Sequence, residues 1–171
     1  MGATNIKLGP CVVTFNAVDL GLTLGGVEVE VATNTKEVNT DQFGETPVEE
    51  IIIGRTCTVK IPLAESTVDN LIAIMPGATK IIDGVDSAVI KAEVQTGVGL
   101  SLLSLAQKLV LKPKEATDDL ENFTVPLAMC PGAMNFAYKI DEERIFMAEF
   151  KAYPDANGLL YVFGDETATA A

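Results

Sequence analysis

The sequence predicts a mainly β fold: an antiparallel β-sandwich or barrel with a flanking α-helix and a long hairpin or loop. Apolar and polar residues alternate with a period of two in four separate segments, which is the pattern of half-buried strands. Only one segment has a clear helical repeat, and turn-forming residues punctuate the rest. We therefore interpret residues 1–171 as one domain, with a flexible tail at residues 164–171.

The four alternating segments are the expected strands. Residues 27–31 alternate valine with glutamate, which places three valines on one face of a strand and two glutamates on the other. Residues 56–63, 88–94 and 146–152 alternate in the same way. Each pattern predicts a strand with an apolar face on the core and a polar face in water.

One short helix is expected after Ser66, which is a good N-cap with Asp69 in the first turn. Its apolar stripe should pack on a sheet, and the chain leaves the helix at Pro76 and Gly77; the stripe consists of Val68, Leu71, Ile72 and Met75. Residues 100–111 fit either a helix or a strand, and we interpret them as strand from about Leu105 onward.

Two turns have a clear chemical basis. Residues 154–158 read Pro-Asp-Ala-Asn-Gly between the 146–152 strand and the apolar segment 159–163, which predicts a hairpin. Asp83 and Gly84 predict a second turn.

The polar segment from Thr33 to Glu50 is unusually long for a connection between two apolar strands. Connections of this length in compact domains are normally functional or disordered. Its β-branched residues and its exposed Phe43 favour an extended hairpin that becomes ordered on a partner.

Charge and composition exclude several function classes. The chain has 24 acidic and 12 basic side chains, a net charge of −12, and no histidine. Such a chain repels phosphate, so it is not an ordinary nucleic-acid binder. Without histidine it also lacks the commonest general base and zinc ligand. Since no catalytic constellation, cofactor motif or metal-ligand spacing stands out, we expect a protein that is not an enzyme and uses no cofactor or metal.

We also expect neither a membrane span nor a signal peptide. No apolar run approaches the ~20 residues that cross a bilayer, so no membrane segment is expected. The polar start from Met1 to Pro10 lacks the order of a signal peptide, which predicts a cytoplasmic product.

The acidic clusters at residues 49–50, 118–121 and 141–143 are either solvated turns or a divalent-cation site, although none has the spacing of an EF-hand loop.

Three cysteines show no C-x-x-C spacing. Cys57 alternates inward with Val59 and is expected in the core. Cys11 lies near a terminus and Cys130 beside a Pro-Gly bend, so these two are the candidates for an inter-subunit disulfide. The alternative is that all three are buried thiols in a reducing cytosol.

At several of these segments the chain resembles the tail tube proteins of long-tailed bacteriophages. The resemblance covers most of the chain and rests on the order and spacing of its pieces. They are residues 19–26 leading into the valine strand, residues 41–47 with Gly-x-Thr-Pro, Gly54, the 58–63 strand leading into the Ser66 helix, and the 154–155 turn closing at Tyr161 and Gly164.

The resemblance implies an assembly. Six subunits would form a ring, the rings would stack into the hollow tail tube that conducts DNA on ejection, and strands of neighbouring subunits would continue into one inner β-barrel. The long hairpin would contact an adjacent ring or subunit through Asn39, Asp41, Gln42, Phe43, Gly44, Glu45, Thr46 and Pro47. The strand acids that are candidates for facing the lumen are Glu28, Glu30, Glu93 and Glu149.

The same resemblance implies the partners. They are further copies of the chain, the tape measure protein, the tail terminator and baseplate proteins and, in a contractile tail, the sheath. DNA would pass through without specific binding, and the protein would belong to the virion tail after assembly in the host cytoplasm. Two alternatives remain: the tube of a phage-tail-like secretion particle, and a soluble β-barrel or sandwich that binds a small apolar ligand.

Overall fold

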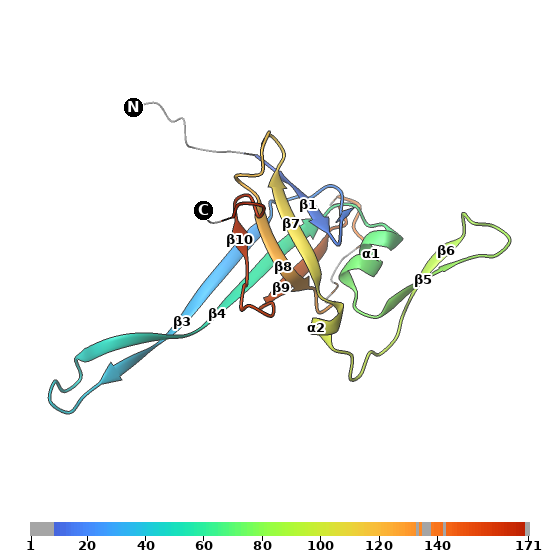
Figure 1. Cartoon of the computed structure of the whole chain (residues 1–171). Coiled ribbons are helices and arrows are strands. Elements are labelled where there is room, and N and C mark those ends of the chain that lie inside the picture. The colour runs from blue at the N-terminus through green and yellow to red at the C-terminus, as the bar shows by residue number, and fades with distance from the viewer. Residues whose placement is uncertain (1–8, 133, 135–137, 142, 170–171) are drawn as a thin grey trace.

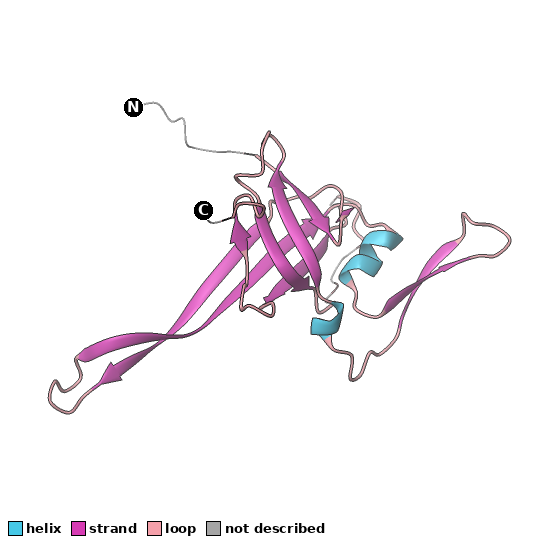
Figure 2. Cartoon of the chain, viewed as in Figure 1, coloured by secondary structure: helices cyan, strands magenta, loops and turns pink. Residues whose placement is uncertain are grey.

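The computed structural model describes residues 9–132, 134, 138–141 and 143–169 and is mainly β, as predicted (Figures 1 and 2). Strands make up a body from which a long hairpin protrudes on one side, and two short helices and a small second sheet lie on the other. The fold class expected from the alternation is therefore confirmed.

The main sheet is antiparallel throughout and follows the order β2-β1-β7-β8-β9-β4-β3, with β10 on a free stretch of β8. Its strands are β1 (Cys11–Phe15), β2 (Val18–Asp19), β3 (Glu28–Asn39), β4 (Pro47–Leu63), β7 (Gln107–Pro113), β8 (Phe123–Met129), β9 (Phe146–Tyr153) and β10 (Val162–Phe163).

The sheet curls over on itself around the core. Phe15 of β1 packs on Phe150 of β9 with ring centroids 4.9 Å apart, although β7 and β8 lie between these strands in the sheet order. Residues 20–24 connect the two ends, because the Leu20 amide donates to the Val13 carbonyl and the Leu24 amide to the Pro62 carbonyl, each at 3.0 Å. The described strands form a sandwich-like curled sheet and do not close into a barrel.

Alternation along β4 places its second half in the core, as predicted for residues 56–63. Cys57, Val59, Ile61 and Leu63 are buried, and the residues between them are not, apart from Pro62. The register Val59↔Phe150 and Ile61↔Ala148 sets these side chains beside the buried face of β9. This ladder anchors the strand that continues into the hairpin.

Two of the expected half-buried strands are not buried on either face. Val29 and Val31 of β3 lie opposite Val59 and Cys57, yet both remain exposed because β3 is the edge strand and no described segment covers them. The segment predicted at residues 88–94 forms β6 (Ile90–Val94), which pairs only with β5 (Ala78–Ile82). A two-stranded sheet has no second layer of its own, and Ile82, Ile90 and Val94 of this one are exposed.

The Thr33 to Glu50 segment forms a hairpin, with residues 40–46 as the connecting loop. β3 and β4 pair from Glu28↔Lys60 to Asn39↔Pro47, and the distal half extends away from the body (Figure 1). Two register shifts interrupt the ladder and leave Ile53 and Val48 of β4 as the extra residues.

The predicted helix exists, but its N-cap was assigned one residue too early. α1 spans Val68–Ile74, and the Thr67 hydroxyl accepts from the Asn70 amide at 3.2 Å. Ser66 instead donates to the carbonyl of Arg144. Residues 100–111 hold both predicted structures in succession: α2 (Leu102–Leu105) and then β7, which starts at Gln107 and not at Leu105.

The turn at residues 154–158 is present, but the predicted hairpin pairing is wrong. The Asp155 amide donates to the Leu159 carbonyl at 3.0 Å, and the Asp155 carboxylate accepts from two amides of the turn. β10 nevertheless pairs with β8, because β4 and β8 already occupy the two edges of β9. The Asp83 turn between β5 and β6 is confirmed, with its carboxylate accepting two backbone amides.

The C-terminal segment contacts the sheet as far as Glu166. The Gly164 amide donates to the Asn122 carbonyl at 2.8 Å, and Glu166 forms an ion pair with Lys108 of β7. Residues 170 and 171 of the expected tail lie outside the described residues.

One buried polar side chain ties α1 to the sheet. Asn70 is only 7% exposed, and its amide nitrogen donates to the carbonyls of Leu20 and Glu65, both at 2.9 Å. The bond to Leu20 holds the segment that spans the two ends of the curled sheet, and the bond to Glu65 holds the chain between β4 and α1.

We expect Asn70→Ala to lower the free energy of unfolding by about 1–3 kcal/mol, because two carbonyls lose their donor in a buried place. Urea unfolding of the monomer measures it. Asn39→Ala, at the exposed end of β3, is the matched control and should change stability by less than about 0.5 kcal/mol. Equal midpoints for the two variants would contradict the role given to Asn70.

Candidate functional site

The distal half of the β3–β4 hairpin carries exposed apolar side chains and includes the predicted contact segment. We call residues 33–53 the distal hairpin. Both of its faces are open to solvent, and Ile51, Ile52 and Ile53 are each about half exposed or more, with Ile53 at 66%. Five acidic side chains and one lysine accompany them between residues 33 and 50. Isolated two-stranded sheets bury too little to justify such a surface for stability alone.

The hairpin tip, residues 40–46, presents Phe43 to solvent. The Phe43 amide donates to the Thr40 carbonyl at 3.1 Å, the Thr46 amide donates to the Phe43 carbonyl at 3.3 Å, and Gly44 takes a positive φ of 63°. Phe43 is 65% exposed.

The structure brings the eight predicted contact residues together. Six lie in the tip, and the other two end its strands; they are Asn39, Asp41, Gln42, Phe43, Gly44, Glu45, Thr46 and Pro47. All eight are exposed.

Three of the four predicted strand acids gather around Lys60 on the polar face of β3, β4 and β9. The Lys60 ammonium lies 3.3 Å from the Glu30 carboxylate and 3.6 Å from that of Glu28, and Glu149 is its cross-strand neighbour on β9. The hydrogen bond to Glu30, followed by the charge of Glu28, raises the pKa of Lys60 above its usual value. We call this the Lys60 face.

The fourth acid, Glu93, does not belong to this face. It lies on β6 in the separate small sheet and pairs with Lys91 at 2.6 Å. The sequence leaves open which of the four acids face a lumen, and the structure places Glu93 on a different sheet from the other three. Strand alternation gave each acid a polar side but gave no information on which strands are neighbours.

Cysteine placement differs from the prediction at Cys130. Cys57 is buried as expected, but Cys130 is 0% exposed, so its position beside a bend does not make it reachable from outside. Cys11 is partly buried at the start of β1. Burial raises the pKa of the Cys11 thiol above its ordinary value of 9.0, which lowers its thiolate fraction and its reactivity at neutral pH.

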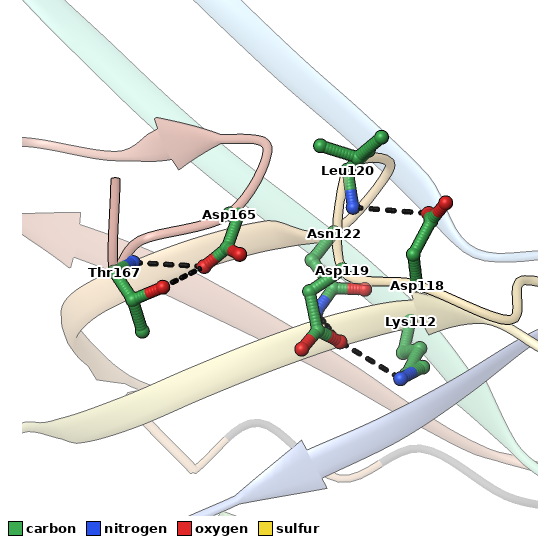
Figure 3. Close-up of polar contacts among 7 residues, drawn as sticks. All are labelled: Lys112, Asp118, Asp119, Leu120, Asn122, Asp165 and Thr167. Atoms are coloured by element: carbon green, nitrogen blue, oxygen red, sulfur yellow. Dashed lines mark hydrogen bonds and ion pairs between the residues drawn. The ribbon is translucent and has the colours of Figure 1, made fainter. Parts of the chain in front are cut away.

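The acidic turn at residues 118–122 makes local contacts (Figure 3). The Asp119 carboxylate accepts from the Lys112 ammonium at 2.8 Å and from the Asn122 side chain at 2.9 Å, and these bonds lower the pKa of Asp119. Hydrogen bonds from Thr167 lower the pKa of Asp165 close by. Among the described residues, no three His, Cys, Asp or Glu side chains gather closely enough to hold a metal ion. Glu142 of the 141–143 cluster lies outside those residues.

The broad hollows of the surface lie at the edges of the sheet. One of about 330 Å³ borders the Lys60 face, one of about 350 Å³ lies between β1 and the start of β3, and one of about 460 Å³ lies at the base of the hairpin. In the part of the chain that the structure describes, neither helix is long and apolar enough to span a membrane.

Comparisons with known proteins assign no family to this chain. No protein-family model matches the chain, and no curated protein matches it.

Sequence reasoning missed two features of this region. Alternation in residues 56–63 places Lys60 on a polar face but does not indicate its acidic partners. The pattern also gives no expectation for the exposure of residues 51–53. The run of three isoleucines breaks the period of two, and that break is the signal that could have identified it.

We expect native-state alkylation by iodoacetamide to modify Cys11 before Cys57 or Cys130. The rate should rise with pH and reach its midpoint above pH 9.0, because the raised pKa delays formation of the thiolate. Peptide mass spectrometry measures the order, with Cys11→Ser as the control. Early modification of Cys130 would contradict the burial described here.

Proposed function

We propose that this protein is a structural subunit that self-assembles into stacked rings, forming a hollow tube of the phage tail type. The observation that carries the proposal is the distal hairpin: a long, paired arm with exposed isoleucines and an exposed Phe43, held out from a body that gives it no cover. A surface of this kind gains stability when another protein buries it. The resemblance to tail tube proteins supplies the partner, which is a further copy of the chain.

The free edge of β3 supports the same proposal. β3 ends the sheet order, so its outer hydrogen-bonding groups face no strand among the described residues, and Val29 and Val31 remain exposed beside them. An edge strand of 12 residues can extend the sheet into a neighbouring subunit by strand addition. Burial of the two valines would then occur in the ring, which explains their apolar character.

The Lys60 face is our candidate for the channel wall. Glu28, Glu30 and Glu149 share it with Lys60, and Lys151 lies on the same side of β9 as Glu149. Three carboxylates and two ammonium groups give this face a charge of −1 in each subunit, far less than the −12 of the chain. A nearly neutral wall has no excess of positive charge that would bind DNA phosphates. The acidic excess of the chain lies outside this face, including in the distal hairpin.

The remaining partners follow from this role and stay proposals: the tape measure protein inside the tube, the terminator and baseplate proteins at its ends, a sheath where the tail contracts, and DNA as passing cargo. The tube of a secretion particle would use the same geometry. The proposed place of the protein is the virion tail, after assembly in the host cytoplasm.

Negative-stain electron microscopy of the purified protein tests the proposal. We expect rings or tubes at high protein concentration. Ile51→Thr with Ile53→Thr keeps β-branched residues on the strand and should change monomer stability by less than about 0.5 kcal/mol, while assembly is lost because the apolar contact is gone.

Ile140→Thr is the matched control, since Ile140 is fully exposed and lies outside the hairpin. It should assemble like the parent chain. A parent chain that stays monomeric at every concentration would overturn the proposal and favour the small-ligand binder.

Assembly should respond to salt in a defined direction. Subunits of charge −12 repel one another, and the screening length falls from about 30 Å at 0.01 M to about 8 Å at 0.15 M salt. We therefore expect light scattering to show a lower threshold concentration for assembly at 0.15 M than at 0.01 M. A threshold that rises with salt would mean that attraction between opposite charges dominates the contacts.

A further inference from the structure

The hollow at the base of the hairpin is not explained by a role in stability. It measures about 460 Å³ and is lined by Arg55, Pro154, Gly158, Leu159, Leu160 and Tyr161. It lies where β4 leaves the main sheet, because the β4–β9 ladder covers only residues 58–63 of β4. We call it the base hollow.

We propose that the base hollow receives the hairpin tip of a second copy of this chain, with Arg55 as its cationic anchor. The inference rests on the proposed self-assembly and names the surface that receives the exposed tip.

Arg55 has the properties of an anchor. It is exposed, and among the described residues no ion pair or hydrogen bond engages its guanidinium, whereas Lys60, Lys80 and Lys108 all have carboxylate partners. Asp155 in the adjoining turn is committed to the amides of Asn157 and Leu159. An unpaired guanidinium beside an apolar wall is the arrangement that favours a carboxylate carried next to an apolar group.

The walls of the hollow are preorganised. Tyr161 stacks on Phe123 of β8 with centroids 5.2 Å apart, and Leu160 packs against the core. The Asp155 turn fixes residues 157–159 through its two 2.8 Å hydrogen bonds. A site with fixed walls loses little conformational freedom when it binds.

The hairpin tip complements this hollow in chemistry. It carries Phe43 at its apex, flanked in sequence by Asp41 and Glu45. The aromatic ring suits the apolar wall, and either carboxylate suits Arg55. In a chain with twice as many acidic as basic side chains, an unpaired arginine attracts an acidic loop of another copy.

The tip of the same chain cannot fill the hollow. Arg55 and Pro47 belong to one continuous strand, and the eight residue steps between them span roughly 25 Å at about 3.3 Å per residue. The occupant must therefore come from another copy. Because tip and hollow are different surfaces, the contact is heterologous: its repetition closes a ring where the rotation between subunits allows closure and otherwise extends the assembly in one direction.

Photo-cross-linking locates the tip in the assembly. Phe43 is replaced by p-benzoylphenylalanine, the assembled protein is irradiated, and cross-linked peptides are identified by mass spectrometry. We expect links between position 43 of one copy and residues 154–161 of another. Links to other segments within well-formed tubes would overturn this inference and leave the proposed function intact.

Links to residues 154–161 in a closed dimer that forms no tubes would support the docking contact and overturn the proposed function. A chain that stays monomeric and yields no links between copies would overturn both.

A charge exchange tests the anchor. Arg55→Glu should raise the threshold concentration for assembly by about tenfold or more, since like charges would then face each other at the contact. Adding Asp41→Arg and Glu45→Arg to Arg55→Glu should restore much of the loss. Lys114→Glu changes the net charge equally at an exposed turn and is the matched control.

An equal effect of Arg55→Glu and Lys114→Glu, or no recovery in the exchanged variant, would overturn the role of Arg55. Circular dichroism and urea unfolding of each variant establish that the monomer remains folded.

Discussion

The structure depends on strand β4, which combines a core strand and one arm of the exposed hairpin in a single continuous backbone. Its second half is buried by alternation, with Cys57, Val59 and Ile61 packed beside β9, and its first half leaves the body as an arm of the hairpin. Because a strand cannot be anchored at one end without orienting the other, the core ladder sets the direction in which the exposed isoleucines and the tip are presented. A protein that assembles by its arm would need this rigidity. Ordering a loosely attached arm on a partner costs conformational entropy, and that cost would offset the free energy gained from the contact.

The sequence was most informative where a period of two reflects burial by the chain itself. It located β4 and β9 and their buried faces, and it found the hairpin from length and turn residues. It failed where burial depends on neighbours that a period does not name: β3 and β6 alternate as convincingly as β4, but Val29, Val31, Ile90 and Val94 remain exposed. Pairing partners are equally hidden, so the predicted hairpin pairs β10 with β9 where the structure pairs it with β8, and alternation does not show that Glu93 lies on a different sheet from Glu28, Glu30 and Glu149.

Local chemistry was predicted to within a residue or two and no closer. Ser66 and Thr67 are both good N-caps, and the choice between them follows from which hydroxyl reaches the Asn70 amide. The position of Cys130 beside a Pro-Gly bend gives no information on depth, and the thiol is buried just after the end of β8. The base hollow could not be foreseen, because residues 55 and 154–161 meet only through the tertiary fold.

The register shifts in the hairpin have a consequence for the protein before it assembles. A long, flat edge rich in valine and isoleucine is a template for unlimited cross-β stacking between chains. The extra residues Ile53 and Val48 interrupt the even spacing of hydrogen-bonding groups and add local twist, so the arm is not a flat, unbroken template. Regular stretches remain between Glu28 and Asn34 and between Thr35 and Val38. The arm is therefore less suited to unlimited cross-β stacking than an uninterrupted strand pair of the same length would be.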